Sequence, residues 1–226
     1  MTVSALIAAF DEAGTIAAVV SGVRPYVDHV VVVDDGSTDS TAESAAAAGA
    51  EVIQHATNRG KGAAIRSGLA AILRRPFTHV LLLDGDLQHD PEEAKRLIAA
   101  AREGVGQFII GERVFSKETM PRSRYYTNTI SSWVISRVFV GAHVADAQSG
   151  YRLISTDLLR SVRLSGRGYE IETEMLIKLA RRGARIDRVP IAVRYTGSRS
   201  KLRPIRDTTR TCFLAVRYRF FPERFQ

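Results

Sequence analysis

The chain has a single cysteine and no long apolar run. Because Cys212 has no second cysteine to pair with, no disulfide can form within the 226 residues, which is typical of a reducing compartment. No apolar stretch approaches the roughly 18 to 20 residues that a membrane-spanning helix needs. The opening residues, MTVSALIAAFDEAG, lack the basic segment of a secretory signal and soon reach acidic residues. We therefore expect a cytoplasmic protein.

The sequence also lacks internal repeats, low-complexity tracts and any clear linker. Its hydrophobic content of 45% and charged content of 25% are ordinary for a folded chain. A chain of 226 residues can bury one sizeable core. We therefore expect one domain over residues 1–226.

Positive charge is concentrated near the C-terminal end. Residues 181–226 carry 13 Lys and Arg against 3 Asp and Glu, whereas residues 1–180 carry 19 against 21. This asymmetry favours a partner that bears phosphate or an anionic surface, although a basic segment that only aids solubility is the alternative. We do not expect a nucleic-acid partner, because the basic residues are confined to one end and no known nucleic-acid-binding module is present.

Short β-branched or leucine-rich runs alternate with alanine-rich stretches over the first 110 residues. The pattern predicts strands at 3–10, 29–35, 51–55, 79–86 and 107–112, and helices at 13–24, 39–48, 60–74 and 91–103. The last helix is the clearest, with Asp90 as its cap and Pro91 in its first position. Such alternation predicts an α/β fold with a Rossmann-like, mostly parallel central sheet flanked by helices, and with ligands at the carboxyl ends of the strands.

The second half of the chain has a different pattern. We expect helices at 123–140 and 169–183 with a loop at 141–152 between them, followed by an extended strand at 184–195 and an amphipathic stretch at 208–221. Gly183 ends the second helix, and Pro190 indicates that the strand lies at a sheet edge or carries a bulge.

The segment LLLDGDLQHDP places acids directly after a leucine-rich strand. A turn after Asp84 lets its side chain converge with that of Asp86, and Gln88 can add a neutral oxygen. Such hard oxygen ligands suit Mg²⁺ or Mn²⁺, which commonly share a substrate diphosphate. The alternative is a simple turn in which Asp90 caps the next helix.

Two earlier segments predict contacts with a nucleotide. In VVDDGSTDS, Asp34 and Asp35 end a strand and can accept hydrogen bonds from a ribose hydroxyl or a base N–H, although a plain loop cap is the alternative. In NRGKGAAIRSG, glycines flank Lys61 at the start of a helix. The backbone N–H groups at the start of this helix, together with the side chains of Lys61 and Arg66, would favour binding of a phosphate.

Together these motifs resemble the family 2 glycosyltransferases of GT-A fold. The matching segments are LIAAFDEAGTI, VVVDDGSTDST, NRGKGAAIRSG, LLLDGDLQHDP, GER, DAQSGYR, YEIETEML and VPIAVRY with SRSKL. They are most similar to the branch of dolichyl-phosphate mannosyltransferase and its bacterial polyprenyl-phosphate relatives. The resemblance covers about residues 3 to 203. It implies one GT-A domain with a nucleotide-sugar half at 1–110, an acceptor half at 111–203 and a basic amphipathic tail at 204–226.

The resemblance also implies an activity and its partners. The expected reaction is inverting transfer of a hexose from a GDP- or UDP-linked sugar to a polyprenyl or dolichyl phosphate, with Mn²⁺ or Mg²⁺ as cofactor. An anionic membrane surface or a small membrane partner could receive the basic end, making the protein peripheral on the cytoplasmic membrane face.

The site residues expected from the motifs and from the resemblance together fall into four groups. The metal ligands are Asp84, Asp86 and Gln88. The residues for the nucleotide-sugar are Glu12, Asp34, Asp35, Lys61, Arg66 and Asp84. The residues that meet the acceptor phosphate are Arg113, Arg124, Arg152, Ser200 and Lys201. The residues expected to act in catalysis are Asp86, Arg113, Arg124 and Glu172.

Some alternatives remain open at this stage. One of Glu170, Glu172 and Glu174 could act as a base or support the site, or all three could be a solvated helix start. A phosphate acceptor is already ionised and needs no base, whereas a soluble hydroxyl acceptor would need one. The second candidate function is therefore a glycosyltransferase with a hydroxyl acceptor, and the third is a non-catalytic nucleotide-binding subunit. The family usually has Pro, Tyr and Asn where this chain has Ala8, Phe10 and Asp11, so the preferred base stays open.

Overall fold

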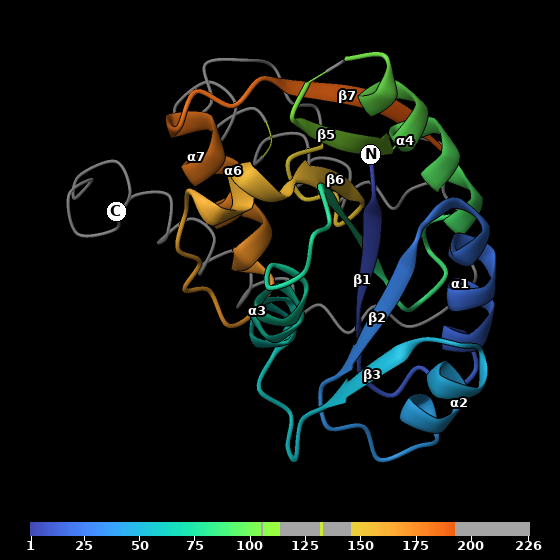
Figure 1. Ribbon diagram of the computed structural model, residues 1–226. Coiled ribbons are helices and arrows are strands. Elements are labelled where there is room, and N and C mark those ends of the chain that lie inside the picture. Colours follow the sequence, from blue (N-terminus) through green and yellow to red (C-terminus); the bar gives the residue numbers. More distant parts are fainter. Residues whose placement is uncertain (105, 114–131, 133–145, 193–226) are drawn as a thin grey trace.

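The computed structural model describes residues 1–104, 106–113, 132 and 146–192. Within these residues, seven strands form one sheet in the order β3-β2-β1-β4-β6-β5-β7 (Figure 1). The strands are β1 (Val3–Ala9), β2 (His29–Asp34), β3 (Glu51–Gln54), β4 (His79–Asp84), β5 (Phe108–Arg113), β6 (Arg152–Ser155) and β7 (Ile186–Ile191). Among these strands only β6 runs antiparallel to its neighbours, so the prediction of a mostly parallel sheet is confirmed.

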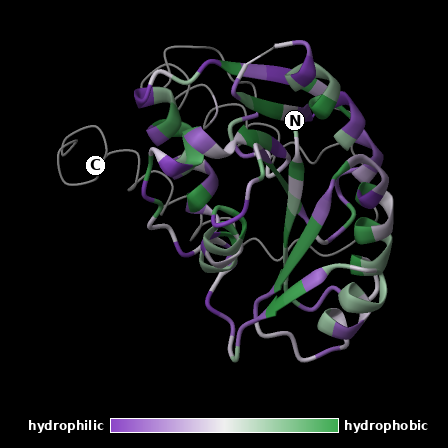
Figure 2. Ribbon diagram, in the orientation of Figure 1, coloured by the Kyte–Doolittle hydropathy of each residue, from purple (hydrophilic) through white to green (hydrophobic). Residues whose placement is uncertain are grey.

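Helices cover both faces of the sheet. Side chains of α1 (Ile16–Val23), α2 (Thr41–Ala47) and α4 (Ala94–Arg102) pack in one hydrophobic core. Those of α3 (Lys61–Ile72), α6 (Thr156–Arg160) and α7 (Glu170–Arg181) pack in the other. Figure 2 shows that β1 and β2 are mostly green, hence hydrophobic, whereas the helices have mixed hydropathy. The architecture is therefore the three-layer arrangement that alternating strands and helices predict.

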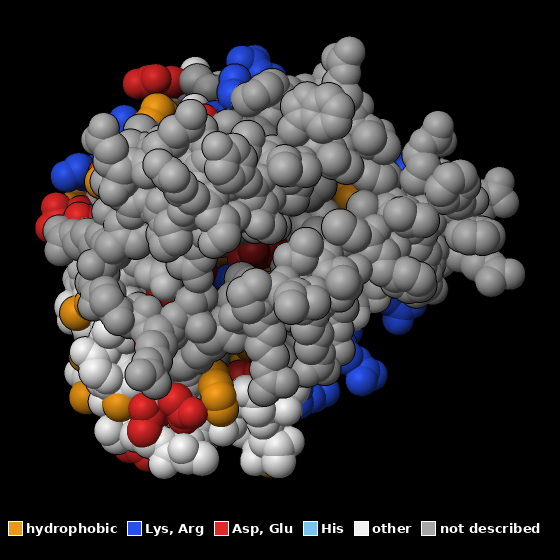
Figure 3. All heavy atoms as spheres, turned by 180° about the vertical axis from the view of Figure 1, so that it is seen from behind, with side chains coloured by type: hydrophobic (Ala, Val, Ile, Leu, Met, Phe, Trp, Pro, Cys, Tyr) orange, Lys and Arg blue, Asp and Glu red, His pale blue; other side chains and the backbone are white. Residues whose placement is uncertain are grey.

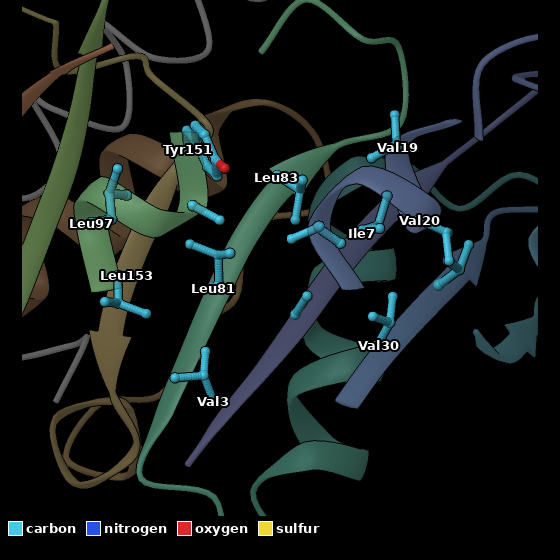
Figure 4. Packing of buried hydrophobic residues seen from close by; sticks show 14 of the residues in the cluster. Val3, Ile7, Val19, Val20, Val30, Leu81, Leu83, Leu97, Tyr151 and Leu153 are labelled. Atoms are coloured by element: carbon cyan, nitrogen blue, oxygen red, sulfur yellow. The ribbon is translucent and has the colours of Figure 1, made fainter. Parts of the chain in front are cut away.

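Alternation along the strands supplies both cores. In β1, Leu6 faces the core with α3, whereas Ile7 faces the core with α1. Figure 4 shows Ile7 and Val20 in this second core, together with Leu81 and Leu83 of β4. Each such side chain is almost fully buried, and burial of one contributes about 1.5 to 3 kcal/mol.

Short helical turns adjoin two of the helices. The 3-10 helix η1 (Arg24–Tyr26) follows α1, and η2 (Pro91–Glu93) precedes α4. The Asp90 side chain accepts a hydrogen bond from Glu92 N at 3.1 Å, which confirms the predicted cap. β7 lies at the edge of the sheet, as Pro190 indicated.

Several predicted elements differ from those observed or cannot be compared. The predicted loop at 141–152 ends in β6, whose four residues are too few to show a periodic pattern, and α6 follows directly. The predicted helix at 123–140 lies outside the described residues except for Ser132, and the amphipathic stretch at 208–221 lies wholly outside them. Among the residues that the structure describes, no helix is long and apolar enough to cross a membrane.

The register of the parallel strands brings the acidic turns to one edge. Asp34 pairs in register with Ala9, and Asp84 pairs with the preceding Ala8. The turns that follow β2 and β4 therefore leave the sheet on either side of the end of β1. The candidate site lies at this edge.

Candidate active site

Lys61, Asp84 and Glu172 form a cluster of charges at the carboxyl end of the sheet. The Lys61 Nζ lies 2.6 Å from Asp84 Oδ1 and 2.6 Å from Glu172 Oε1. These residues come from the first turn of α3, the end of β4 and the first turn of α7, so the cluster joins segments far apart in the sequence. In the view from behind, acidic and basic atoms are visible together deep near the centre of the face (Figure 3).

The cluster is held largely out of solvent. The side chains of Lys61, Asp84 and Glu172 are 14%, 25% and 10% exposed. Burial alone would lower the pKa of Lys61, but the charges of Asp84 and Glu172 outweigh burial and raise it. Burial alone would raise the pKa of Asp84, but Lys61 outweighs it and lowers that pKa. Lys61 and Asp84 therefore stay charged at neutral pH.

Gly150 lets the two carboxylates of the cluster come together. A Cβ atom at this position would lie 2.9 Å from Asp84 Oδ2 and 2.9 Å from Glu172 Oε1, closer than real Cβ atoms approach. Gly150 of the SGYR segment is therefore needed because a side chain there would collide with the two carboxylates, and not because its backbone conformation favours glycine.

We expect Gly150→Ala to disrupt this cluster. The added methyl group should push Asp84 or Glu172 away from Lys61, lowering stability by about 1 to 3 kcal/mol and donor turnover by about tenfold or more. Gly14→Ala is the matched control, because a Cβ there would meet nothing within 4 Å and its φ is not positive. Thermal unfolding and steady-state kinetics of both variants test this. Equal behaviour of the two variants would contradict the role given to Gly150.

The turn after β4 carries the second acid of the motif. The Asp86 side chain is half-buried, and its Oδ1 accepts a hydrogen bond from Gln88 N at 3.0 Å. Leu87 has a positive φ of 59°, a strained conformation that bends this turn. Burial, and then the negative charge of Asp84, raise the pKa of Asp86 to about 6. A nearby cation would relieve this crowding of negative charge.

The donor set of this turn fits a divalent metal ion that shares its coordination with a substrate. The described residues contain no group of three or more His, Cys, Asp or Glu that could hold a metal ion by themselves. Asp84, Asp86 and Gln88 offer two carboxylates and one amide oxygen, and magnesium and manganese often complete such a set with water and phosphate oxygens.

Glu12 lies beside this turn. The Thr15 hydroxyl donates to Gly85 O at 2.7 Å and lies 3.2 Å from Glu12 Oε2, so the start of α1 is tied to the Asp84–Asp86 turn. The charge of Glu12 also contributes to the raised pKa of Asp86. The structure therefore brings Glu12 to the predicted metal-binding turn.

Asp34 and Asp35 are buried and engaged by the protein itself. Asp34 accepts hydrogen bonds from the Ser37 N–H, the Ser37 hydroxyl and Gln54 Nε2. Asp35 has a 2.6 Å contact with His55 Nδ1 and accepts from the N–H groups that follow in the loop after β3. Asp34 thus has the arrangement of the alternative loop-cap interpretation, and direct contact of either carboxylate with a nucleoside stays a prediction.

Two backbone N–H groups of the predicted phosphate cradle at the start of α3 are already engaged within the protein. Gly62 N donates to Arg167 O at 2.8 Å, and Ala63 N lies 3.3 Å from the same oxygen. A Cβ at Gly62 would lie 2.5 Å from Gly166 O. The glycine therefore allows close packing against the loop before α7, whose carbonyl occupies the N–H groups.

Arg66 lies one turn further along α3. Its side chain is half-buried, and its buried Nε atom has no hydrogen-bond partner within the part of the chain that the structure describes. A role of Arg66 toward the donor phosphate stays a prediction.

Arg113 and Asp146 form a second ion pair near the site. Arg113 Nε lies 2.5 Å from Asp146 Oδ2, and Arg113 Nη2 lies 2.8 Å from Asp146 Oδ1, a bidentate arrangement. The Asp146 side chain is fully buried, and that of Arg113 is 17% exposed. Sequence reasoning missed Asp146, although it lies in the DAQSGYR segment on which the resemblance rests.

His89 is buried beside Tyr151, just after the acidic turn. The two rings lie 5.4 Å apart, and neither imidazole nitrogen of His89 has a hydrogen-bond partner among the described residues. Burial lowers the pKa of His89 to about 4, although Asp84 opposes this shift. His89 is therefore neutral at pH 7.

Arg152 does not reach the acceptor side. It is fully buried in β6 and donates to three backbone carbonyls, those of Ser149, Ala147 and Glu172, at 2.6 to 2.9 Å. The prediction that Arg152 contacts an acceptor phosphate is therefore wrong, and its guanidinium instead holds the SGYR loop against α7. Arg124, Ser200 and Lys201 lie outside the described residues.

The acids at the start of α7 are not a solvated helix start. Glu174 is fully buried and accepts from Ser165 and Gly166, while Glu170 accepts from the N–H groups of two residues in the same loop. Glu172 pairs with Lys61. The solvated interpretation is wrong, and these acids organise the loop before α7 and the site.

Comparison with known proteins identifies the protein family to which the chain belongs. The family model described as Glycosyl transferase family 2 matches residues 4–163. The chain belongs to glycosyl transferase family 2, and its fold is the GT-A fold of its structural neighbours.

Two curated relatives are named for their activity. Glycosyltransferase AglJ of Haloferax volcanii is 35% identical over 204 residues, which cover 88% of this chain and 65% of AglJ. The undecaprenyl-phosphate mannosyltransferase of Micrococcus luteus is 33% identical over 173 residues, which cover 72% of this chain and 70% of that enzyme. The chain thus spans somewhat less than two thirds of the length of AglJ.

Solved structures agree with this assignment. The glucosyl-3-phosphoglycerate synthase of Mycobacterium tuberculosis in complex with uridine diphosphate gives a TM-score of 0.74 at 26% identity, covering 96% of this chain and 79% of that one. The same enzyme with Mn²⁺, UDP-glucose and phosphoglyceric acid gives 0.73 at 25% identity, with coverage of 96% and 79%.

Proposed function

We propose that this protein is an inverting glycosyltransferase that moves a hexose from a GDP- or UDP-linked sugar to a polyprenyl or dolichyl phosphate. Family membership and the name of the Micrococcus luteus relative support the reaction class. The observation that carries the proposal is the gathering of Lys61, Asp84, Asp86 and Glu172 at the ligand edge of the sheet. As part of the same proposal, residues 1–110 bind the donor and residues 111–203 bind the acceptor.

The donor diphosphate requires positive charge, because it leaves with negative charge. Asp84, Asp86 and Gln88 would hold Mn²⁺ or Mg²⁺, which when bound neutralises the leaving diphosphate. Lys61 keeps its positive charge beside Asp84 and supplies further compensation at the same edge. The solved Mycobacterium tuberculosis neighbour with Mn²⁺ and UDP-glucose supports this arrangement.

The ion pairs of Glu172 and Asp146 support an acceptor that is already ionised. Glu172 is paired with Lys61, and Asp146 is paired with Arg113, so neither carboxylate is ready to accept a proton from a hydroxyl. A phosphate oxygen needs no base: it forms a bond to the sugar C1 from the face opposite the leaving diphosphate. The bond from C1 to the diphosphate oxygen breaks, and the diphosphate leaves with the electron pair. Arg113, with two of its N–H groups already directed by Asp146, would orient that phosphate.

A lipid phosphate acceptor would be met at a membrane surface. We propose that the protein is cytoplasmic and associates with anionic lipid through the basic residues of 181–226, each contributing about 1 kcal/mol when close to the surface. Such association is weakened by salt.

The proposal predicts that the purified enzyme glycosylates a polyprenyl phosphate from a GDP- or UDP-sugar in the presence of Mn²⁺ or Mg²⁺. Arg113→Lys should lower acceptor use by about tenfold or more, because lysine cannot reproduce the bidentate contact with Asp146 that directs this side chain. The same substitution should leave donor hydrolysis nearly unchanged. Arg188→Lys, at an exposed position of the edge strand β7, is the control.

Two results would contradict this proposal. Transfer to a soluble alcohol with no transfer to lipid phosphate would favour the hydroxyl-acceptor function. Tight binding of a nucleotide-sugar without turnover in any acceptor panel would favour a non-catalytic nucleotide-binding subunit.

A further inference from the structure

A chain of hydrogen bonds next to the start of α3 joins Asp35, His55 and Ser67. His55 Nδ1 lies 2.6 Å from Asp35 Oδ1, and His55 Nε2 lies 2.9 Å from Ser67 Oγ. Asp35 and His55 are buried, with 3% and 7% exposure. Asp35 directly follows β2, His55 directly follows β3, and Ser67 lies in the middle of α3, so the chain of hydrogen bonds connects three parts of the fold.

The order serine, histidine, aspartate is that of a nucleophilic triad, but the setting does not suit a nucleophile. Ser67 lies in the interior of α3, where backbone N–H groups are used by the helix and cannot stabilise an oxyanion. A structural role for the chain follows from what lies at its other end. Asp35 also accepts hydrogen bonds from Arg59 N at 3.0 Å and from Gly60 N at 2.7 Å.

These two N–H groups directly precede Lys61. Gly60 has a φ of 94°, a conformation that favours glycine, and α3 begins at the next residue. The Asp35 carboxylate therefore sets the turn from which the Lys61 side chain extends to Asp84 and Glu172. His55 in turn fixes that carboxylate, because its Nδ1–H donates to Asp35 both in the neutral Nδ1–H tautomer and in the imidazolium.

We propose that His55 is a positioning residue for Lys61 that acts through Asp35. The inference rests on the proposed function for its catalytic consequence, since Lys61 is placed there at the donor diphosphate. The hydrogen bond to Asp35 carries the effect. The contact with Ser67 only steadies the ring.

Two substitutions of His55 separate these contacts. In His55→Asn the amide nitrogen can take the place of Nδ1 and keep the donor to Asp35, whereas in His55→Gln the longer side chain reaches the place of Nε2 and Ser67. Ser67→Ala removes only the contact with Ser67. We expect His55→Gln to raise the donor KM and to lower kcat/KM by about tenfold or more, while His55→Asn and Ser67→Ala stay within about threefold of wild type.

A second measurement needs no substrate. Because the Lys61 ammonium lies 2.6 Å from two carboxylates and is mostly buried, its ¹⁵N-bound protons should exchange slowly enough for a separate ¹H–¹⁵N signal. Lys61→Met identifies the signal by its loss. The signal should persist in His55→Asn and Ser67→Ala and be lost or shifted in folded His55→Gln.

Several results would overturn the proposal. One is an unchanged Lys61 signal in His55→Gln. Another is loss of the Lys61 signal in folded His55→Asn or in Ser67→Ala. A third is labelling by a fluorophosphonate that depends on Ser67, because such labelling would indicate that Ser67 is a nucleophile. If His55→Gln does not fold, the other two variants still decide. Absence of glycosyl transfer in the wild-type protein would contradict the proposed function alone and would leave the test of the Lys61 signal intact.

Discussion

Asp86→Asn is expected to abolish glycosyl transfer while leaving the fold at least as stable as the wild type at pH 7. The substitution removes a carboxylate from the predicted metal-binding turn and keeps its shape and its bond from Gln88 N. Transfer and donor hydrolysis should fall to background at any Mn²⁺ or Mg²⁺ concentration. Full activity of the variant, or of the wild type in excess chelator, would contradict the metal assignment.

The pH dependence of stability gives a second measure of the same residue. The folded protein holds the pKa of Asp86 at about 6, above its ordinary value of 3.8, so ionisation of Asp86 is less favourable in the folded state. Its ionisation therefore lowers stability as the pH rises from about 4 to about 6, and by pH 7 the loss is on the order of 1 to 3 kcal/mol. Asp86→Asn should lack this loss and match the wild type below pH 4. Urea unfolding across this pH range measures the difference, and a wild-type protein that gains stability relative to the variant over that range would exclude the stated shift.

Lys61→Met is expected to destabilise the protein by about 3 to 5 kcal/mol. It removes the positive charge between Asp84 and Glu172 and leaves two largely buried carboxylates without their partner. Donor affinity should fall as well, because Lys61 lies at the proposed diphosphate position. Denaturant unfolding and calorimetric titration with UDP and GDP measure the two effects.

Matched variants distinguish the buried cluster from an ordinary ion pair. Lys95→Met breaks a pair whose side chains are more than half exposed, and it should change stability by less than about 1 kcal/mol. Adding Glu172→Gln to Lys61→Met should restore part of the lost stability, because one buried charge is then removed. A Lys61→Met protein as stable as Lys95→Met would show that the cluster is not buried in solution.

The sequence was most informative where one pattern repeats along one element. Alternating strands and helices predicted the mostly parallel sheet, and Asp90 with Pro91 predicted the start of the helical segment at residue 91. β6 was missed because four residues between a loop and a helix show no period. Its reversed direction depends on pairing with two strands that are distant along the chain.

Site residues were harder to predict because partners decide what a side chain can do. Lys61, Asp84 and Glu172 were each selected separately, but nothing in their spacing indicated that they meet. Arg152 has the residue type of a phosphate ligand, yet three carbonyls surround it. The glycines around Lys61 indicated a phosphate cradle, whereas the second of them packs against a loop more than a hundred residues away.

The position of β6 also constrains the order in which the chain can fold as it leaves the ribosome. β3, β2, β1 and β4 are consecutive in the sheet and can pair once residue 84 has emerged. β5 is made next, but its neighbours among the described strands are β6 and β7, so within the described part of the chain its first partner is complete only when residue 155 has been synthesised. At typical synthesis rates of about 5 to 20 residues per second, the apolar β5 waits several seconds for its partner. During this interval β5 and the open edge of β4 are the surfaces that a nascent-chain chaperone would be expected to cover.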